Sequence, residues 1–290
     1  MNKRIGSNRI ITWLFLLPSG LFLLVTGIIP ILYSLALSFC NYKINRPNTP
    51  IQFIGLENYI RMFTEADFLR TVINTFVFAI LSVALEVVLG IIIAMLVSGD
   101  SKFEKFFLSL FMIPMIMAPV AAGTMWRMLL DSSTGVINYL TSLAGLGRIP
   151  WLARPLTAFA AISFVNIWQL VPWVTIIVVS GIKGLSAETV HSALLDGAKP
   201  FSVFWHIVLP EIRGLLVVVL LMRFIDAFKV FDTIYVMTDG GPGIATEMLP
   251  NYIFKQALNY FDAGYSAALS IMFIIVMTLF CLMFTRIRRI

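Results

Sequence analysis

The stretch LLDGAKPFSVFWHIVLP, from Leu194 to Pro210, is a half-polar segment between two long apolar runs. Within it, Asp196, Gly197 and Lys199 interrupt a sequence that otherwise suits lipid. The chain of 290 residues is 59% hydrophobic and only 12% charged, whereas soluble domains carry about 25% charged residues. Several runs reach the length of about 20 apolar residues that a helix needs to cross a bilayer. The composition therefore predicts an all-α integral membrane protein.

Local signals divide the half-polar segment into two short helices. Ser186 can cap the first helix, and Gly197 can adopt the left-handed conformation that ends it. Pro200 suits the first turn of the second helix, and Pro210 is expected to stop that helix. We therefore predict a helix, a glycine turn and a second helix over Ala187–Val208. Five apolar side chains would be available outside the bilayer: Val190, Leu194, Phe201, Phe204 and Trp205.

Such a segment has two interpretations. Its apolar side chains can touch lipid headgroups as an interfacial loop, or they can fit a groove on a soluble partner. A short amphipathic helix held rigidly between two membrane spans favours the second interpretation, because a rigid element suits docking.

Six apolar runs are long enough to cross a membrane as helices. We predict spans at Ile11–Phe39, Thr71–Val97, Phe106–Met128, Thr157–Ile182, Leu215–Met237 and Gly264–Thr285. An even number of spans puts both termini on one side, and the termini carry basic residues without an acid: Lys3, Arg4, Arg9, Arg286, Arg288 and Arg289. The positive-inside rule makes both termini cytoplasmic. Residues 1–290 are thus predicted to form one transmembrane domain, with a cytoplasmic loop at 183–213.

No sequence pattern indicates an enzyme. The chain lacks a P-loop, a zinc-spaced cluster of His and Cys, and a G-x-S-x-G motif. His191 and His206 have no other ligand types beside them, so we expect no metal site and no catalytic residue. The net charge of +6 comes from basic residues at the ends of apolar runs. This pattern is typical of topology signals, and it predicts no binding of nucleic acid.

The stretch QFIGLENYIRMFTEADFLRT, from Gln52 to Thr71, predicts a short amphipathic helix before the second span. Its apolar face would consist of Leu56, Tyr59, Ile60 and Phe63. Glu57, Arg61 and Glu65 would lie opposite. We expect this helix to lie at the membrane interface.

Charged residues occur inside two of the predicted spans. Arg223, Asp226 and Lys229 recur every three residues, so they lie on neighbouring positions of one helix surface. Glu86 lies midway along the second span. A charge at the bilayer centre costs about 2.5–3.5 kcal/mol, so these side chains must face protein or a wet cavity. They either form a structural network or, together with Asn166, line a pathway for a hydroxylated or anionic solute.

The segment LSAETVHSALLDGAKPFSVFWHIVLPEIRG resembles the EAA loop of permease subunits in binding-protein-dependent ABC importers. Seven residues stand at matching positions: Ala193, Asp196, Gly197, Ala198, Ile207, Leu209 and Pro210. The sequence departs from the family at the signature itself, because His191-Ser192-Ala193 stands where Glu-Ala-Ala is usual.

The resemblance extends along nearly the whole chain and indicates the maltose-type, carbohydrate-uptake branch of that family. FIGLENYIRMF and the apolar run after it resemble the lead-in and second span of this branch. FIDAFKVFDTIYVMTDGGPGIATEML and YIFKQALNYFDAGYSAALS resemble its fifth and sixth spans.

The resemblance implies the type I ABC importer fold with six transmembrane helices and a coupling helix. It implies a bacterial or archaeal cytoplasmic membrane, a second homologous permease subunit, two ATPase subunits, and an external binding protein that delivers a carbohydrate or related polar solute. This chain would bind no cofactor, because ATP and Mg would be used by the ATPase subunits. The ATPase-coupling residues would be Val190, His191, Leu194, Asp196, Gly197, Ala198, Phe201, Phe204, Leu209 and Pro210.

The alternative is a secondary transporter, or another polytopic membrane protein without an ATPase partner. A secondary transporter predicts inverted repeats with broken helices and carboxylates for a coupling ion, and the sequence shows no such symmetry.

Overall fold

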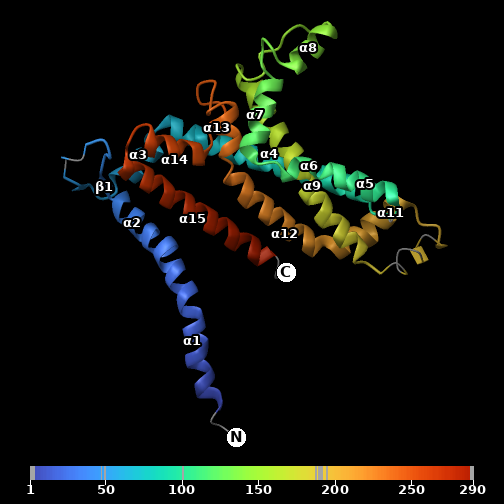
Figure 1. Ribbon diagram of the computed structural model, residues 1–290, viewed down its shortest axis with the longest axis horizontal. Coiled ribbons are helices and arrows are strands. Elements are labelled where there is room, and N and C mark those ends of the chain that lie inside the picture. Colours follow the sequence, from blue (N-terminus) through green and yellow to red (C-terminus); the bar gives the residue numbers. More distant parts are fainter. Residues whose placement is uncertain are drawn as a thin grey trace. The chain divides into compact units, whose positions relative to one another are not determined.

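The computed structural model describes residues 4–46, 48, 50–99, 101–186, 188, 192–193 and 195–287 (Figure 1). Contacts within the chain define two compact units. The first unit comprises Met1–Glu65 and Ile253–Val276, and the second comprises Ala66–Tyr252 and Met277–Ile290. Helices α14 (Leu249–Leu258) and α15 (Ala263–Ile287) contribute residues to both units.

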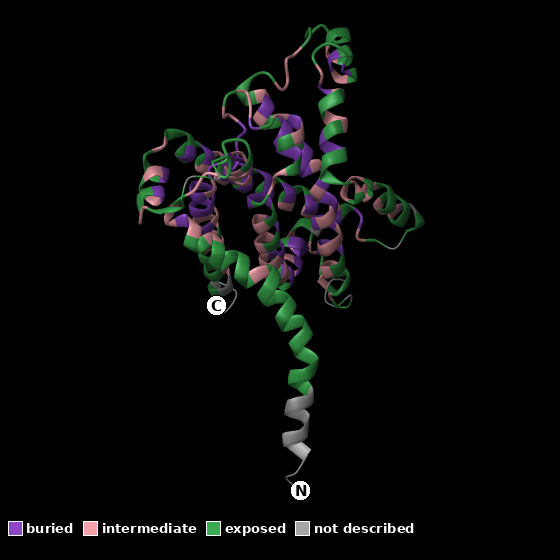
Figure 2. Ribbon diagram, turned by 60° about the vertical axis from the view of Figure 1, so that its left-hand side comes forward, coloured by how far each residue is buried: buried purple, intermediate pink, exposed green. Residues whose placement is uncertain are grey.

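The first unit begins with a long helix and continues into a small β-hairpin. The helix consists of α1 (Arg4–Leu23), the π-helical turn η1 (Leu24–Ile28) and α2 (Ile29–Ser38). Side chains along its apolar part, Thr12–Ser38, are mostly exposed (Figure 2). Strands β1 (Cys40–Asn41) and β2 (Gln52–Phe53) pair antiparallel, and α3 (Glu57–Thr64) follows them.

Helices α4 (Ala66–Leu96) and α9 (Pro155–Lys183) form the centre of the second unit, and α12 (Leu209–Phe228) packs against both. The remaining elements of this unit are α5 (Lys102–Phe111), α6 (Ile113–Ile116), α7 (Pro119–Leu129), α8 (Val136–Leu143), α11 (Pro200–Val203), η2 (Phe204–Val208) and α13 (Asp232–Met237).

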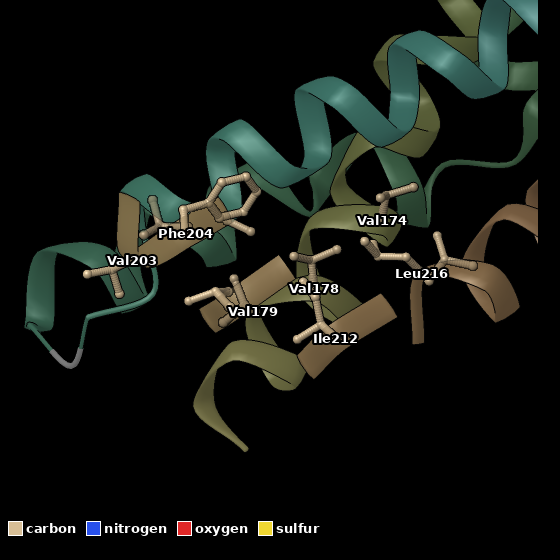
Figure 3. Close-up of a cluster of buried hydrophobic side chains, with 11 residues drawn as sticks. Val174, Val178, Val179, Val203, Phe204, Ile212 and Leu216 are labelled. Carbon is tan, nitrogen blue, oxygen red and sulfur yellow. The ribbon is translucent and has the colours of Figure 1, made fainter. Parts of the chain in front are cut away.

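Small and aromatic residues set how α4 and α9 meet. Phe78 of α4 lies edge to face with Phe159 of α9, with ring centroids 6.3 Å apart. Further along, Gly90 of α4 lies directly against Val174 of α9. A buried cluster that includes Val174 also takes in Phe204 and Ile212 (Figure 3), so the core reaches the half-polar segment.

Within the described part of the chain, four helices are long and apolar enough to cross a membrane: Thr12–Ser38, Ala66–Leu96, Pro155–Lys183 and Ala263–Phe284. They correspond to the first, second, fourth and sixth predicted spans. A bent pair, Glu104–Ile116 with Pro119–Leu129, makes a fifth if it is one span. Helix α12 lies where the fifth span is predicted, but it is not among the four apolar helices. The reason is its four charged residues, Glu211, Arg213, Arg223 and Asp226.

The prediction of one continuous helix over Phe106–Met128 is wrong. The chain bends by 93° between Ile116 and Pro119, where Met117 and Ala118 adopt extended conformations. A residue that precedes proline is disfavoured in the helical region, which explains the break at Ala118. Gln169 of α9 donates from Nε2 to the Met117 carbonyl at 2.8 Å. The break therefore keeps this backbone group satisfied, as a low-dielectric surrounding requires.

The prediction of one helix over Leu215–Met237 is also wrong. Helix α12 ends at Phe228, and the separate α13 begins at Asp232. The carboxylate of Asp232 lies in the first turn of α13, where the positive end of the helix dipole favours an acid.

We predict that Gly90→Leu destabilises the protein. A Cβ at Gly90 would lie 2.6 Å from Val174 Cγ1, so a larger side chain must push α4 and α9 apart. The expected loss is about 1–3 kcal/mol, measured as thermal unfolding in detergent. Gly214→Leu is the matched control, because no heavy atom of the described residues lies within 4 Å of its Cβ position. Equal unfolding midpoints for the two variants would contradict the prediction.

Candidate coupling segment and buried ion-pair network

The predicted glycine turn is confirmed. Gly197 has φ +82°, and the amide of Ala198 donates to the Ala193 carbonyl at 3.0 Å. This bond from the second residue beyond the cap back into the last helical turn is typical of the Schellman motif. No heavy atom of the described residues lies within 4 Å of a Cβ built at Gly197. Backbone conformation, and not lack of space, is therefore the reason for glycine here.

Pro200 begins α11 as predicted, but the prediction that Pro210 stops this helix is wrong. Helical backbone runs from α11 through η2 into α12. In the π-helical turn, the amide of Leu209 donates to the Phe204 carbonyl five residues earlier. This wider turn accommodates a proline in the next turn, because proline has no N–H and crowds the carbonyl four residues before it.

The aromatic residues of this helix lie on two faces. Phe201 is 71% exposed and Trp205 is 50% exposed, whereas Phe204 is only 8% exposed. Phe204 packs in the buried cluster with Val203 and Val178 (Figure 3). The prediction that Phe204 is available outside the bilayer is therefore wrong. Its position instead links the exposed face of the segment to the core of the second unit.

The other predicted coupling residues lie around this helix. Leu195 is 88% exposed next to the Gly197 turn, and Asp196 is exposed. Leu209 and Ala198 are half-buried against the cluster that contains Phe204. Pro210 is exposed. Three of the predicted residues fall outside the described part of the chain: Val190, His191 and Leu194.

The charged side chains predicted inside the spans form one chain of ion pairs. Arg223 donates from Nε to Glu86 Oε2 at 2.7 Å and from Nη1 to Asp226 Oδ2 at 3.2 Å. Lys229 Nζ lies 3.7 Å from Asp226 Oδ1. The Arg223 guanidinium also lies over the ring of Trp173, 5.9 Å from its centroid. The network thus connects α4, α9 and α12.

Burial falls steadily along this network. The side chains of Glu86 and Arg223 are 0% and 2% exposed, whereas those of Asp226 and Lys229 are 53% and 56% exposed. The shortest pair is therefore the fully buried one, between Arg223 and Glu86. Three buried atoms have no hydrogen-bond partner among the described residues. They are Glu86 Oε1, Arg223 Nη2 and Oδ1 of Asn166, a residue of α9. These atoms can accept or donate to water or to a solute hydroxyl.

Two residues of α9 complete these sites but were missed in the sequence. Gln169 donates a hydrogen bond to the Met117 carbonyl at the break in the third span, and the Trp173 ring lies beside the Arg223 guanidinium. The sequence did contain a signal for Gln169, because a polar side chain in the middle of an apolar span needs a hydrogen-bond partner. The ring of Trp173 gave no comparable signal, since aromatic residues are common in spans.

The segment 239–247, which begins with the sequence DGGP, forms a loop that is fixed to α4. Gly240 and Gly243 have φ of +81° and +60°, which glycine adopts without steric cost. Asn74 of α4 donates to the carbonyls of Ile244 at 2.9 Å and Glu247 at 3.2 Å. The loop is thereby held on the α4 surface at the end of α13.

The loop after α7 is held by the carboxyl group of Asp131. Asp131 Oδ1 accepts hydrogen bonds from the hydroxyls and amides of Ser133 and Thr134. These bonds, led by the Ser133 hydroxyl, hold the pKa of the Asp131 carboxyl well below its usual range. Asp131 therefore stays ionised near neutral pH, and it serves as a turn-forming residue.

The sequence matches a known protein family over almost its whole length. The family model for the "Binding-protein-dependent transport system inner membrane component" matches residues 7–290. The probable ABC transporter permease protein y4oQ of Sinorhizobium fredii is 32% identical, over 94% of this chain and 87% of its own length. The trehalose/maltose transport system permease protein MalF of Thermococcus litoralis is 31% identical, over 96% of this chain and 93% of its own length.

The fold also matches a solved structure. A chain of the bacterial alginate ABC transporter, crystallised with its periplasmic protein and a bound alginate pentasaccharide, superposes with a TM-score of 0.85. The two chains are 22% identical, and the match covers 99% of this chain and 98% of that one. The resemblance found in the sequence is confirmed: this chain belongs to the family of inner-membrane components of binding-protein-dependent transport systems, the permease subunits of ABC importers.

Proposed function

We propose that this chain is one of two permease subunits of an ATP-driven importer for a carbohydrate or related polar solute. An external binding protein delivers the solute, and two ATPase subunits, which use ATP and Mg, bind on the cytoplasmic side. The chain itself catalyses no reaction. It crosses the cytoplasmic membrane six times, counting the bent third span and the charged α12, and both termini are cytoplasmic. The trehalose/maltose permease among its relatives supports a carbohydrate as the solute.

One observation carries the coupling role. Leu195, Phe201 and Trp205 are exposed around the Gly197 turn, on a helical segment whose opposite face is packed in the core. An exposed apolar face on a rigid element fits a groove of a partner protein. A displacement of the docked face reaches α12 as a rigid-body movement, because packed elements shift together.

The charged face of α12 supports a polar solute path. Asp226 in the last turn of α12 and Lys229 directly after this helix are both half exposed. Charges in such a position face a water-filled cavity or another protein subunit. We assign the exposed Asp226–Lys229 pair to the solute path and the buried Glu86–Arg223 pair to the packing of the helices.

Gly197→Val should abolish transport while the subunit still inserts into the membrane. Valine at φ +82° is strained by more than about 1 kcal/mol, so the turn that presents Phe201 must change. The readouts are copurification of the ATPase subunits and uptake of the solute held by the matching binding protein.

Two control variants separate the turn from other effects of substitution. Gly197→Asn should retain most docking, because asparagine tolerates the left-handed conformation. Gly214→Val changes a glycine of ordinary conformation and open surroundings, and it should leave docking unchanged. Normal copurification and uptake in Gly197→Val would refute the docking role of this segment.

Cysteine labelling tests the orientation of the chain. In a background with Cys40→Ser and Cys281→Ser, a membrane-impermeant reagent should label Lys199→Cys only from the cytoplasmic side. Tyr139→Cys, in the predicted external loop after α7, should be labelled only from outside. Labelling of position 199 from outside would overturn the proposed orientation.

The Glu86–Arg223 pair should behave as a coupled structural unit. Arg223→Met leaves the buried Glu86 carboxylate without its cation, at an expected cost of about 3–5 kcal/mol. The double variant Glu86→Leu/Arg223→Met should recover much of this loss in the thermal unfolding of the assembled complex. Losses that merely add up, without recovery in the double variant, would contradict the pairing.

Asp226→Asn is the matched contrast for the exposed end of the same network. A half-exposed ion pair contributes about 0–1 kcal/mol, so stability should change little. The variant should instead raise the solute concentration that half-saturates uptake.

A further inference from the structure

Helix α3 and the residue before it expose one stripe of apolar side chains, although Met62 of the same helix is buried. Asn58 and Met62 are 6% and 0% exposed, whereas Leu56, Ile60 and Phe63 are 60%, 64% and 57% exposed. The exposed three recur at helical spacing and form one stripe. Phe53 of the neighbouring strand β2 is 78% exposed. We name Phe53, Leu56, Ile60 and Phe63 the α3 apolar face.

Polar contacts fix the rotation of α3 on one side. Asn58 Nδ2 donates to the carbonyls of Ser38 at 2.9 Å and Cys40 at 3.0 Å. The hydroxyls of Tyr59 and Ser38 are 2.8 Å apart. Tyr59 therefore leaves the apolar face on which the sequence placed it. A helix held in this way keeps Leu56, Ile60 and Phe63 pointing outward.

Arg61 fixes the other side of α3. Its guanidinium donates to Asp262 Oδ2 and Glu65 Oε1, each at 2.9 Å, and lies 3.9 Å over the ring of Tyr265. Tyr265 Oη in turn donates to Glu65 Oε2 at 2.7 Å. This charge is thus neutralised on the protein side of the helix.

The partners of α3 are the end residues of two membrane spans. Ser38 is the last residue of the span Thr12–Ser38, and Asp262 directly precedes the span Ala263–Phe284. Gly264 near the start of this second span also donates its amide to the Tyr42 carbonyl at 3.1 Å, beside β1. Helix α3 consequently lies beside the ends of both candidate spans.

We propose that the α3 apolar face is inserted into the membrane surface, at the boundary between phospholipid headgroups and acyl chains. At this depth an amphipathic helix buries its apolar side chains and keeps its polar groups at the headgroups. The same side chains exposed to water would forgo the favourable free energy of removing apolar surface from water. The exposed Tyr260 of the same unit suits this level, where tyrosines are enriched.

The position of α3 gives it a role between the two spans. Because Asn58 holds the end of α2 and Arg61 holds the start of α15, the helix is a brace at the membrane surface that keeps two span ends together. Membrane contact does not depend on the proposed transport function. With the orientation proposed above, this surface belongs to the outer leaflet, and only this assignment of the leaflet rests on the proposed function.

Spin labels provide the test. Ile60→Cys and Phe63→Cys, in the full chain with Cys40→Ser and Cys281→Ser, are labelled and placed in nanodiscs of phosphatidylcholine and phosphatidylglycerol. Glu57→Cys is the matched control, because Glu57 is exposed on the polar flank of the same helix. The ratio of collisions with oxygen to collisions with a water-soluble nickel chelate should be severalfold higher at 60 and 63 than at 57.

A fluorescent label at the same cysteines gives an independent readout. Its emission should be quenched at 60 and 63, and not at 57, when the lipids carry a nitroxide on their acyl chains. Positions 60 and 63 are more than half exposed, so these substitutions leave no internal cavity.

Three outcomes would overturn the proposal. Free access of the nickel chelate to positions 60 and 63 would place the face in water. Protection that begins only when a soluble binding protein is added would make it a protein-docking surface. Protection from both oxygen and nickel would show that another subunit covers it.

Discussion

The ion pair between Glu86 and Arg223 is the constraint on which the arrangement of the second unit depends. Both side chains are almost fully buried, and Nε and Oε2 are 2.7 Å apart. Separating these two buried side chains would leave two unpaired charges inside the protein, so α4 and α12 stay in the register that joins them. The pair therefore fixes the rotation of α12 about its own axis. This rotation leaves the side chains of Asp226 and Lys229 half exposed at the C-terminal end of α12.

The same physical demand shapes the irregular parts of the helices. Pro30 and Pro210 each follow a π-helical turn, Leu24–Ile28 in one case and Phe204–Val208 in the other. In both turns an amide donates to the carbonyl five residues earlier, so the helix widens and continues through the proline. At Pro119 the helix breaks instead, and Gln169 satisfies the Met117 carbonyl. These three prolines thus lead to a widened turn or to a break, whereas Pro18 of α1 and Pro172 of α9 lie inside uninterrupted α-helix.

The sequence predicted what local rules decide. The span ends near Ser38 and Ala263, the left-handed turn at Gly197 and the clustering of Arg223 with Asp226 all follow from periodicity, glycine conformation or short helical spacing. The sequence failed where a distant residue decides. Pro119 restricts Ala118 locally, but the Met117 carbonyl that the break frees is satisfied by Gln169 of another helix, and the inward position of Tyr59 depends on Ser38.

Phe204 shows how one local error propagates to the site. If the helix ended at Pro210, the rotation of the turn before it would be independent of α12. Phe201, Phe204 and Trp205 could then all be exposed to a partner, as predicted from the sequence. Because the helix in fact continues, the rotation of this turn follows from that of α12. Phe204 then faces the core, and only its two aromatic neighbours face outward.

This continuity also explains how a docked partner can act on the membrane domain. Helical backbone runs from Pro200 to Phe228 without a break, and at about 1.5 Å per residue it spans roughly 40 Å, more than the hydrocarbon core of a bilayer. A hinge at Pro210 would absorb a push on Phe201 before it reached the charged residues. The π-helical turn removes this hinge, and Phe204 and Ile212 anchor the two sides of the turn in one core. The first interruption comes at Lys229, beyond Asp226. Under the proposed docking role, a movement of the exposed face would therefore arrive at the charged end of α12 as a displacement of the whole helix, and the Glu86–Arg223 pair would carry it on to α4.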